Sequence, residues 1–324
     1  MSVFHFSLLR LLADGEFHSG ERLARTLGLS RTGVWNQIRR IEALGLRVFR
    51  VRGRGYRLAR SIDLLDRETL AERLRRTCPT LSIEMMDECN STNSILAERA
   101  VRGAPSGTVL VCEHQSAGRG RRGNVWHSAI GASLVFSLLR RFSQGPEALA
   151  GLSLAVAVGA ARALEKLGVT GMQVKWPNDL YCMERKLGGI LIEISGNIAG
   201  PSAAVIGVGL NVRLDAALRE RIGQPVTDVA SVSDAPRSRV ELLVELLEAI
   251  DNVLAQFARK GFAPFRGEWL RRHAWQGRRV AVSIADRLVA EGEVLGVAED
   301  GALMLASPRG VERFHSGELT LRRA

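Results

Sequence analysis

Short apolar repeats separated by glycines open the chain. Apolar residues between positions 8 and 12 predict a short helix that ends near Gly15. A second helix is expected from a Ser19 cap to Leu27, where Gly28 interrupts the pattern. A short helix that a tight glycine turn joins to the next helix is the first half of a helix-turn-helix pattern.

A third helix is expected after Ser30, a residue type that caps helix starts. Within it Val34, Ile38 and Ile41 fall on one face, because they are four and three residues apart. Residues 48–58 then alternate apolar and polar positions around a Gly-Arg-Gly tip, which predicts a pair of strands. The whole pattern is typical of a winged helix-turn-helix.

Basic residues concentrate in this region. The chain has a net charge of +11, and residues 1–60 hold twelve arginines, no lysine and four acidic residues. We therefore expect this module to bind DNA through its phosphate backbone. The candidates for facing DNA are Arg31, Thr32, Trp35, Asn36 and Arg39 on the third helix and Arg52 and Arg54 on the wing. In an alternative interpretation Trp35 packs against the wing and the arginines contact only phosphates.

Mixed helix and strand patterns follow a boundary near residues 59–65. A helix is expected at 67–77, and apolar runs predict strands at 107–112, 132–139, 190–194 and 203–212. Long helical patterns cover 147–167 and 238–259, with a shorter helix at 262–272. These elements predict a central mixed α/β domain within an α+β multidomain chain.

Short strands dominate the last fifty residues. Strand patterns at 279–284, 287–297, 302–306 and 311–314 are separated by turn residues, which predicts a small β barrel. We therefore divide the chain into a winged-helix domain (1–62), a central domain (63–273) and a C-terminal barrel (274–324).

Composition excludes several classes of protein. No apolar run approaches the roughly 20 residues that span a bilayer, and the start lacks a basic signal-peptide region, so we expect a cytoplasmic protein without a membrane partner. The four cysteines and six histidines form no Cys-x-x-Cys or His-x-x-x-His pair. This spacing argues against a disulfide framework and against a metal site fixed by side chains.

The segment Gly118-Arg119-Gly120-Arg121-Arg122-Gly123 is the first candidate for chemistry. Its glycines allow close backbone approach to a ligand, and its arginines carry fixed positive charge. It matches a Gly-x-Gly-x-x-Gly search, but a strand is expected after it and no acidic residue follows about twenty residues on, so a dinucleotide fold is not indicated. For this segment alone, a solvated basic loop is an equally good interpretation.

The second candidate is Lys175-Trp176-Pro177-Asn178-Asp179-Leu180, which predicts a strand that ends in a turn. Lys186 begins the next strand, so the Asp179 carboxylate and the ammonium groups of Lys175 and Lys186 are expected at one strand rim. Taken singly, Lys175 or Asp179 suits a surface ion pair. Neither segment holds a covalent nucleophile, and together they suit the handling of a phosphoanhydride.

Several motifs carry a family resemblance. Residues 113–123, 175–180, 185–191 and 207–212 resemble biotin–protein ligases in order and spacing. The N-terminal motifs resemble the winged helix of the bifunctional ligase and biotin-operon repressor, and the C-terminal barrel matches its third domain. The resemblance covers essentially the whole chain and implies a class II synthetase-like central domain and an SH3-like barrel. The chain departs from the family at Asn124-Val125, where relatives commonly have a basic residue before the tryptophan.

The resemblance also implies roles for single residues. The biotin pocket would be formed by Ser91, Thr92, Asn93, Gln115, Arg119, Gly120, Arg121 and Lys186. The adenylate and ATP would contact Arg121, Arg122, Trp126, Lys175, Asn178 and Asn211. Catalysis would depend on Lys186, Arg121 and Asp179, with Mg²⁺ bound together with ATP.

The implied reaction joins biotin and ATP into biotinyl-5′-AMP and then transfers biotin to a lysine of the biotin carboxyl carrier protein of acetyl-CoA carboxylase. The adenylate would also act as corepressor, by favouring a homodimer that pairs two winged helices on biotin operator DNA. Two alternatives stay open: a biotin-sensing transcription factor without ligase turnover, and a lipoate-type acyl-adenylating ligase.

Overall fold

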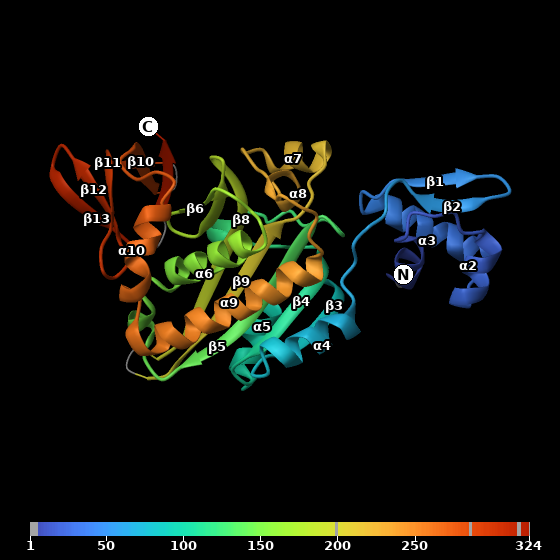
Figure 1. The fold of residues 1–324 in the computed structure, drawn as a ribbon, viewed down its shortest axis with the longest axis horizontal. Coiled ribbons are helices and arrows are strands. Elements are labelled where there is room, and N and C mark those ends of the chain that lie inside the picture. The colour runs from blue at the N-terminus through green and yellow to red at the C-terminus, as the bar shows by residue number, and fades with distance from the viewer. Residues whose placement is uncertain (1–5, 198–199, 285–286, 316–318, 324) are drawn as a thin grey trace.

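A winged helix, a central α/β body and a C-terminal β domain follow one another along the longest axis of the molecule (Figure 1). The computed structural model describes residues 6–197, 200–284, 287–315 and 319–323. The order and type of these three parts confirm the predicted α+β multidomain fold.

The N-terminal part contains α1 (Phe6–Leu12), α2 (Gly20–Leu27), α3 (Arg31–Ala43), β1 (Val48–Val51) and β2 (Gly55–Leu58). Both predicted caps are confirmed, because Ser19 Oγ accepts from Arg22 N and Ser30 Oγ accepts from Gly33 N. The predicted inner face of α3 is buried among the leucines of α1, so this domain has its own small core.

A seven-stranded sheet forms the centre of the molecule. Its spatial order is β3 (Ser82–Cys89), β4 (Thr108–Gln115), β5 (Ser133–Phe142), β9 (Ser202–Asn211), β8 (Arg185–Gly196), β7 (Asp179–Cys182) and β6 (Met172–Lys175). Only the β3–β4 pair is parallel. The four predicted strands are confirmed, whereas β3 was not predicted, since half of the residues of this edge strand are polar and half are exposed.

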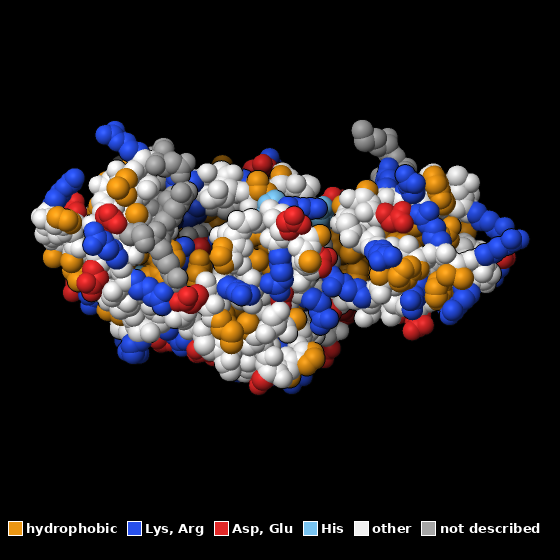
Figure 2. Space-filling model, turned by 90° about the horizontal axis from the view of Figure 1, so that it is seen from above, with side chains coloured by type: hydrophobic (Ala, Val, Ile, Leu, Met, Phe, Trp, Pro, Cys, Tyr) orange, Lys and Arg blue, Asp and Glu red, His pale blue; other side chains and the backbone are white. Residues whose placement is uncertain are grey.

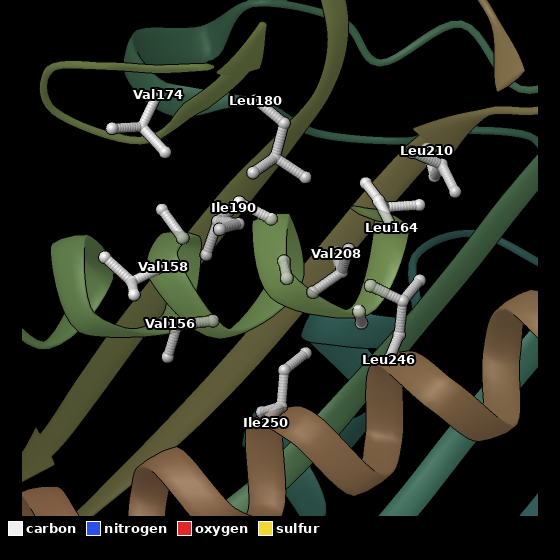
Figure 3. Packing of buried hydrophobic residues seen from close by; sticks show 14 of the residues in the cluster. Val156, Val158, Leu164, Val174, Leu180, Ile190, Val208, Leu210, Leu246 and Ile250 are labelled. Carbon is white, nitrogen blue, oxygen red and sulfur yellow. The ribbon is translucent and has the colours of Figure 1, made fainter. Parts of the chain in front are cut away.

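Helices α6 (Leu152–Lys166) and α9 (Arg239–Lys260) pack on one face of this sheet. In Figure 3, Val156, Val158 and Leu164 of α6 and Leu246 and Ile250 of α9 meet apolar side chains of β6 to β9. Burial of each such side chain contributes about 1.5–3 kcal/mol. Helix α4 (Arg67–Thr77) packs beside α9, and α5 (Thr92–Val101) covers β4, β5 and β9 on the opposite face.

The helix expected at 147–167 begins later than predicted. Residues Pro146–Leu149 form a 3₁₀ turn, and Gly151 takes a left-handed backbone conformation (φ 79°) before α6 starts. The stretch Pro146–Lys166 is long and apolar enough to cross a membrane by length and composition, contrary to the expectation from the sequence. Most of this stretch is buried inside the protein, as in a core helix.

The C-terminal domain follows α10 (Ala263–Arg272). It is an antiparallel sheet in the order β13 (Gly310–Phe314), β12 (Leu303–Ser307), β11 (Arg287–Val297), β10 (Arg279–Ile284) and β14 (Leu319–Arg323). Four of these strands were predicted and β14 was not. Trp176 Nε1 donates to Gly301 O at 3.1 Å, which joins this domain to the turn after β6. Two short helices, α7 (Ala216–Ile222) and α8 (Val229–Val232), were also not predicted.

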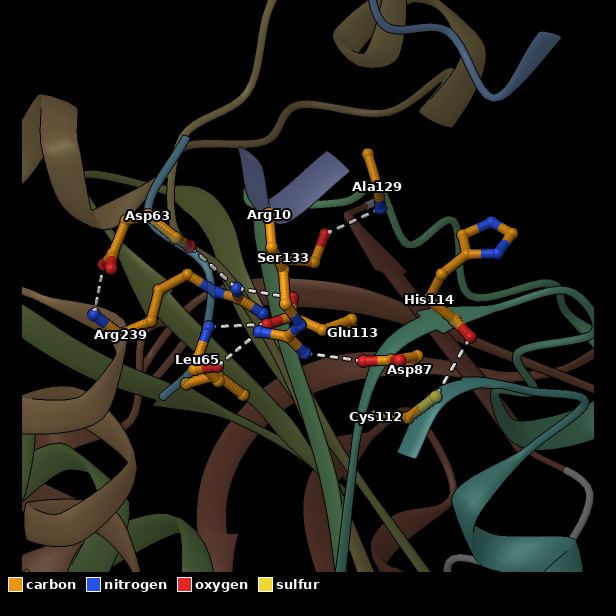
Figure 4. A network of polar contacts seen from close by, with 10 residues as sticks. All are labelled: Arg10, Asp63, Leu65, Asp87, Cys112, Glu113, His114, Ala129, Ser133 and Arg239. Carbon is orange, nitrogen blue, oxygen red and sulfur yellow. Dashed lines mark hydrogen bonds and ion pairs between the residues drawn. The ribbon is translucent and has the colours of Figure 1, made fainter. Parts of the chain in front are cut away.

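A buried polar network holds the segment that follows the winged helix (Figure 4). Glu113 of β4 and Arg239 of α9 form a fully buried ion pair at 2.6 Å. Glu113 Oε1 also accepts from Leu65 N at 2.5 Å, and Asp63 accepts from Arg239 N at 2.6 Å. The linker is therefore bound to the strand that leads into the Gly118–Gly123 loop.

Candidate functional site

One open cleft of about 740 Å³ lies on the central sheet. It brings together every residue that the sequence assigned to biotin, adenylate or catalysis. These are Ser91, Thr92, Asn93, Gln115, Arg119, Gly120, Arg121, Arg122, Trp126, Lys175, Asn178, Asp179, Lys186 and Asn211. The lining also includes Gly207 and Gly209 of β9, which alternate with the buried core residues Val208 and Leu210. Glycines at these positions let the side chains of Asn93 and Trp126 approach the strand closely.

Hydroxyl and amide groups form one end of the cleft. Ser91 caps α5, and Thr92 donates to Gln115 Oε1 from both its backbone N (2.7 Å) and its Oγ1 (3.0 Å). The buried Ser137 Oγ lies 2.7 Å from Thr92 Oγ1. Sequence reasoning missed Ser137, although a serine within the apolar run of β5 was a visible signal.

Both the nitrogen and the oxygen of the Asn93 side-chain amide form hydrogen bonds within the protein. Its Nδ2 donates to Leu191 O (3.2 Å) and to Glu193 Oε2 (2.9 Å), and its Oδ1 accepts from Ser137 at 2.6 Å. A Cβ at Gly207 would lie 2.1 Å from Asn93 Oδ1, so only glycine fits there. This geometry makes Asn93 part of the wall of the cleft, rather than a free amide that faces a ligand.

The Gly118–Gly123 loop folds back on itself above the sheet. Gly120 N donates to Asn124 O at 2.7 Å, and Trp126 N donates to Gly118 O at 2.9 Å. Arg122 has a left-handed backbone (φ 58°), a conformation that non-glycine residues adopt mainly where the surrounding structure enforces it. The Trp126 ring packs directly on Gly209, since a Cβ there would lie 2.5 Å from the ring. Its indole Nε1 is buried and finds no acceptor among the described residues, which leaves a donor for a ligand.

The other end of the cleft is cationic. Lys186 Nζ lies 2.8 Å from Asp179 Oδ1, and both side chains are about four-fifths buried (19% and 17% exposed). The antiparallel β7–β8 pairing sets Asp179 opposite Gly189, so two of the three groups expected at one strand rim, Asp179 and Lys186, meet there. Asn211 Nδ2 donates to Thr227 O at 3.1 Å, and Asn178 Nδ2 donates to Ile190 O at 2.7 Å, so both amides fix the surrounding backbone.

Arg121 enters the same end from the loop. Burial lowers the pKa of its guanidinium, and the nearby Asp179 carboxylate opposes that shift. A cation held out of water gains most from an anionic partner in the same low-dielectric space. The Arg121 side chain therefore suits a phosphate in the cleft.

Lys175 departs from the expected arrangement. It pairs with Asp179 in the β6–β7 register, but its ammonium lies 4.0 Å from the centre of the Trp275 ring and donates to Tyr181 OH at 3.3 Å. The side chain thus points toward the start of the C-terminal domain. Cation–π contact with a tryptophan holds an ammonium in place without neutralising it.

The winged helix exposes all seven candidates for DNA contact. Trp35 is 43% exposed, and the Arg39 guanidinium lies 5.5 Å from the centre of its ring. On the wing, Arg54 stacks on Phe17 at 4.2 Å, and Arg57, which was not singled out from the sequence, stacks on the same ring at 5.0 Å. Figure 2 shows Lys and Arg side chains gathered over this end of the molecule.

Comparisons with known proteins agree with this site. The Biotin/lipoate A/B protein ligase family matches residues 86–211, and an HTH domain matches residues 5–57. The bifunctional ligase/repressor BirA of Escherichia coli is 36% identical over 98% of this chain and 97% of its own length. The biotin–[acetyl-CoA-carboxylase] ligase of Paracoccus denitrificans is 32% identical over 72% of this chain and 98% of its own length.

A solved structure extends the agreement to the fold. The biotin protein ligase of Aquifex aeolicus in complex with biotin and ATP superimposes with a TM-score of 0.64 at 28% identity, over 75% of this chain and 99% of that one. The BirA relatives account in addition for the N-terminal arm. The chain belongs to the bifunctional ligase/repressor branch of the biotin–protein ligase family.

Proposed function

We propose that the central cleft joins biotin and ATP into biotinyl-5′-AMP and passes the biotinyl group to a lysine of the biotin carboxyl carrier protein of acetyl-CoA carboxylase. The observation that carries this proposal is a single cleft with a hydroxyl and amide end at Thr92 and Gln115 and a cationic end at Lys186 and Arg121. The first end suits the ureido ring of biotin, and the second suits a carboxylate that meets a phosphate.

The chemistry follows from charge. The biotin carboxylate attacks the α-phosphorus of ATP and pyrophosphate leaves, so two anions must approach each other. Lys186 and Arg121 neutralise the charge that accumulates on the α-phosphate. In the second step the carrier lysine amine attacks the acyl carbon and AMP leaves with the bonding electrons. Asp179, which lies beside Lys186, would orient that amine or accept its proton.

Loop residues protect the intermediate. A mixed anhydride hydrolyses when water reaches it, so the Gly118–Gly123 loop would fold over the adenylate, with its glycines as pivots and Trp126 as an apolar cover. The Trp126 contact with Gly209 already places the ring over the sheet. Arg122, Lys175, Asn178 and Asn211 would line the nucleotide side of the closed cleft.

The donor set suits Mg²⁺ that arrives with ATP. Within the ranges that the structure describes, no three His, Cys, Asp or Glu side chains gather into a metal site. Asp179 is the carboxylate of the cationic end and would be the protein contact of such an ion. When bound, Mg²⁺ would offset the charge of the phosphates.

We further propose that the arm represses transcription as a dimer. The adenylate would order the loops of the cleft, favour a homodimer and so pair two winged helices on biotin operator DNA in the cytoplasm. We keep the domain limits 1–62, 63–273 and 274–324. The first boundary then falls in the linker that Glu113 and Arg239 bind, and the second falls after α10. The exposed arginines of α3 and the wing support the DNA-binding role.

Mass spectrometry tests the enzymatic proposal. Incubation with biotin, ATP, Mg²⁺ and an isolated carrier domain should add one biotinyl group to the carrier, and Lys186→Ala should not. Pyrophosphate release without biotin transfer would contradict the second step. If neither pyrophosphate nor biotinylated carrier forms, the protein is a biotin sensor without ligase turnover. A competition assay with lipoate decides whether the cleft takes biotin or lipoate.

Gel shifts test the repressor proposal: binding to DNA upstream of biotin-synthesis genes should depend on biotin and ATP together.

A further inference from the structure

Glu193 of β8 connects two walls of the cleft. Its Oε1 accepts from Arg119 Nη2 at 3.0 Å, and its Oε2 accepts from Asn93 Nδ2 at 2.9 Å and from Arg119 Nη2 at 3.2 Å. Asn93 belongs to the first turn of α5, and Arg119 belongs to the loop that follows β4. The Glu193 carboxylate thus joins side chains from two other segments, α5 and the loop after β4, to strand β8.

The contact with Arg119 differs from the backbone hydrogen bonds of the loop. The hydrogen bonds from Gly120 to Asn124 and from Trp126 to Gly118 lie within the loop, so they maintain its shape. The Arg119–Glu193 ion pair instead joins the loop to the sheet. Because glycines flank Arg119 on both sides, the position of this arginine depends on what holds its side chain.

Stability is a poor explanation for this ion pair. The side chains of Arg119 and Glu193 are 49% and 36% exposed, and exposed pairs of this kind contribute about 0–1 kcal/mol to folding. Its placement matters more than its strength, because Asn93 and Arg119 both line the cleft. A weak tether at a loop that must open and close leaves both states accessible.

We propose that Glu193 is a positioning residue for the ligase reaction, which holds Arg119, and with it the Gly118–Gly123 loop, against Asn93 over the bound biotin and adenylate. The inference rests on the proposed function of the cleft. Glu193 acts through these two residues and touches no reacting atom. Loss of its charge opens the loop, whereas loss of its oxygens also frees the Asn93 amide.

Two substitutions separate these effects. Glu193→Gln keeps an oxygen that accepts from Asn93 but no longer pairs with the charge of Arg119, and Glu193→Ala removes both contacts. The matched control is Glu84→Gln on β3, which breaks an ion pair with Arg99 of α5 on the same domain, away from the cleft lining. Both are arginine–glutamate ion pairs of similar exposure, although Arg99 uses two nitrogens and Arg119 uses Nη2 alone.

The first measurement is trypsin cleavage after the arginines of the loop in the free full-length chain. Glu193→Gln should raise the cleavage rate about five- to tenfold, and Glu84→Gln should leave it within twofold of wild type. In the Arg119→Ala background, Glu193→Gln should add nothing, because its effect passes through Arg119. Equal cleavage rates in wild type and Glu193→Gln would overturn the inference.

The second measurement is the dissociation rate of biotinyl-5′-AMP. Glu193→Gln should raise it about five- to tenfold and weaken biotin binding through the released Arg119, and Glu193→Ala should weaken biotin binding further because it also frees Asn93. If wild type forms the adenylate but all variants release it at the same rate, Glu193 has no positioning role and the ligase function stands. If wild type forms no adenylate, the proposed function fails, and the cleavage rates still decide whether Glu193 holds the loop.

Discussion

We expect the first chemical step to depend most on the side chain of Lys186. Its ammonium shares the cationic end of the cleft with Arg121, and the Asp179 carboxylate at 2.8 Å keeps it in place before substrates arrive. In a site shielded from water, one preorganised cation contributes far more to a transition state than it does in bulk solvent. Arg121 lies in the loop between β4 and β5, whereas Lys186 lies on strand β8.

Lys186→Ala should therefore slow adenylate formation by about 10²–10³-fold, a typical effect of removing one group that stabilises transition-state charge. Single-turnover release of pyrophosphate measures this step directly. Lys166→Ala is the matched control, because that ammonium pairs with Glu245 on the outside of α6 and α9. A loss of less than tenfold would assign the main charge stabilisation to Arg121.

Burial of His273 makes the stability of the protein depend on pH. The ring stacks on Trp269 at 4.5 Å at the end of α10, and burial lowers the pKa of the imidazole to about 4 from the usual 6.5. The unfolded chain binds this proton at a higher pH than the folded chain, so stability falls as the pH drops from about 6.5 to about 4. The full loss amounts to about 3 kcal/mol.

His273→Phe should remove this contribution, because phenylalanine does not titrate and keeps a ring beside Trp269. Denaturant unfolding at pH 7 and at pH 4.5 gives the comparison: the free energy of unfolding should fall by less in the variant than in wild type. An identical fall in both proteins would show that other groups cause the acid sensitivity. The prediction is restricted to stability, since His273 is not among the residues that line the cleft.

At the scale of elements, the sequence predicts what local chemistry decides. The caps Ser19 and Ser30 and the apolar face of α3 depend only on neighbours in the chain, and all three were predictable. Strand β3 and helices α7 and α8 were not predictable from the sequence. A polar edge strand and helices of one or two turns show no strong periodicity of apolar residues.

Residues of the site divide in the same way. Motif residues such as Lys186 and Arg121 were found because their spacing resembles a family. Ser137 and Glu193 were not, since their roles arise from contacts with Thr92, Asn93 and Arg119 across segments. The inward-facing amide of Asn93 is likewise a tertiary property, which the resemblance alone did not reveal.

The ion pair of Glu113 and Arg239 connects elements rather than single residues. Both side chains are fully buried, and the pair joins β4 to α9 and to the linker at Leu65 (Figure 4). Glu113→Gln should destabilise the protein by about 3–5 kcal/mol, because the Arg239 charge then lies buried without a counter-ion. The double variant Glu113→Leu/Arg239→Met should recover much of that loss in thermal unfolding. If the double variant is no more stable than Glu113→Gln, the cost lies in packing and not in the unpaired charge.

At the scale of the whole molecule, the linker after the winged helix contacts β4, the strand that ends at Gln115. Arg10 of α1 donates to Leu65 O and to Asp87, and Ile130 from the segment after Trp126 packs into the core of the winged helix. The arm therefore rests on the central domain, and Ile130 lies three residues after His127, which lines the cleft. Closure of the loop over an adenylate would act on the segment that carries Ile130, and this gives the proposed coupling between ligand and DNA a physical route.

The wing provides the final prediction. Arg54 stacks on Phe17 at 4.2 Å, so its guanidinium is partly ordered before DNA arrives and loses less entropy when it meets a phosphate. Arg54→Ala should weaken binding to two duplexes of unrelated sequence by similar factors, and the slope of log K against log salt should decrease by about one. Arg99→Ala, which removes an equal charge from the central domain, should change neither quantity. A loss confined to one sequence at unchanged salt slope would instead assign Arg54 to a base edge, because a base contact releases no counter-ion from the phosphate backbone.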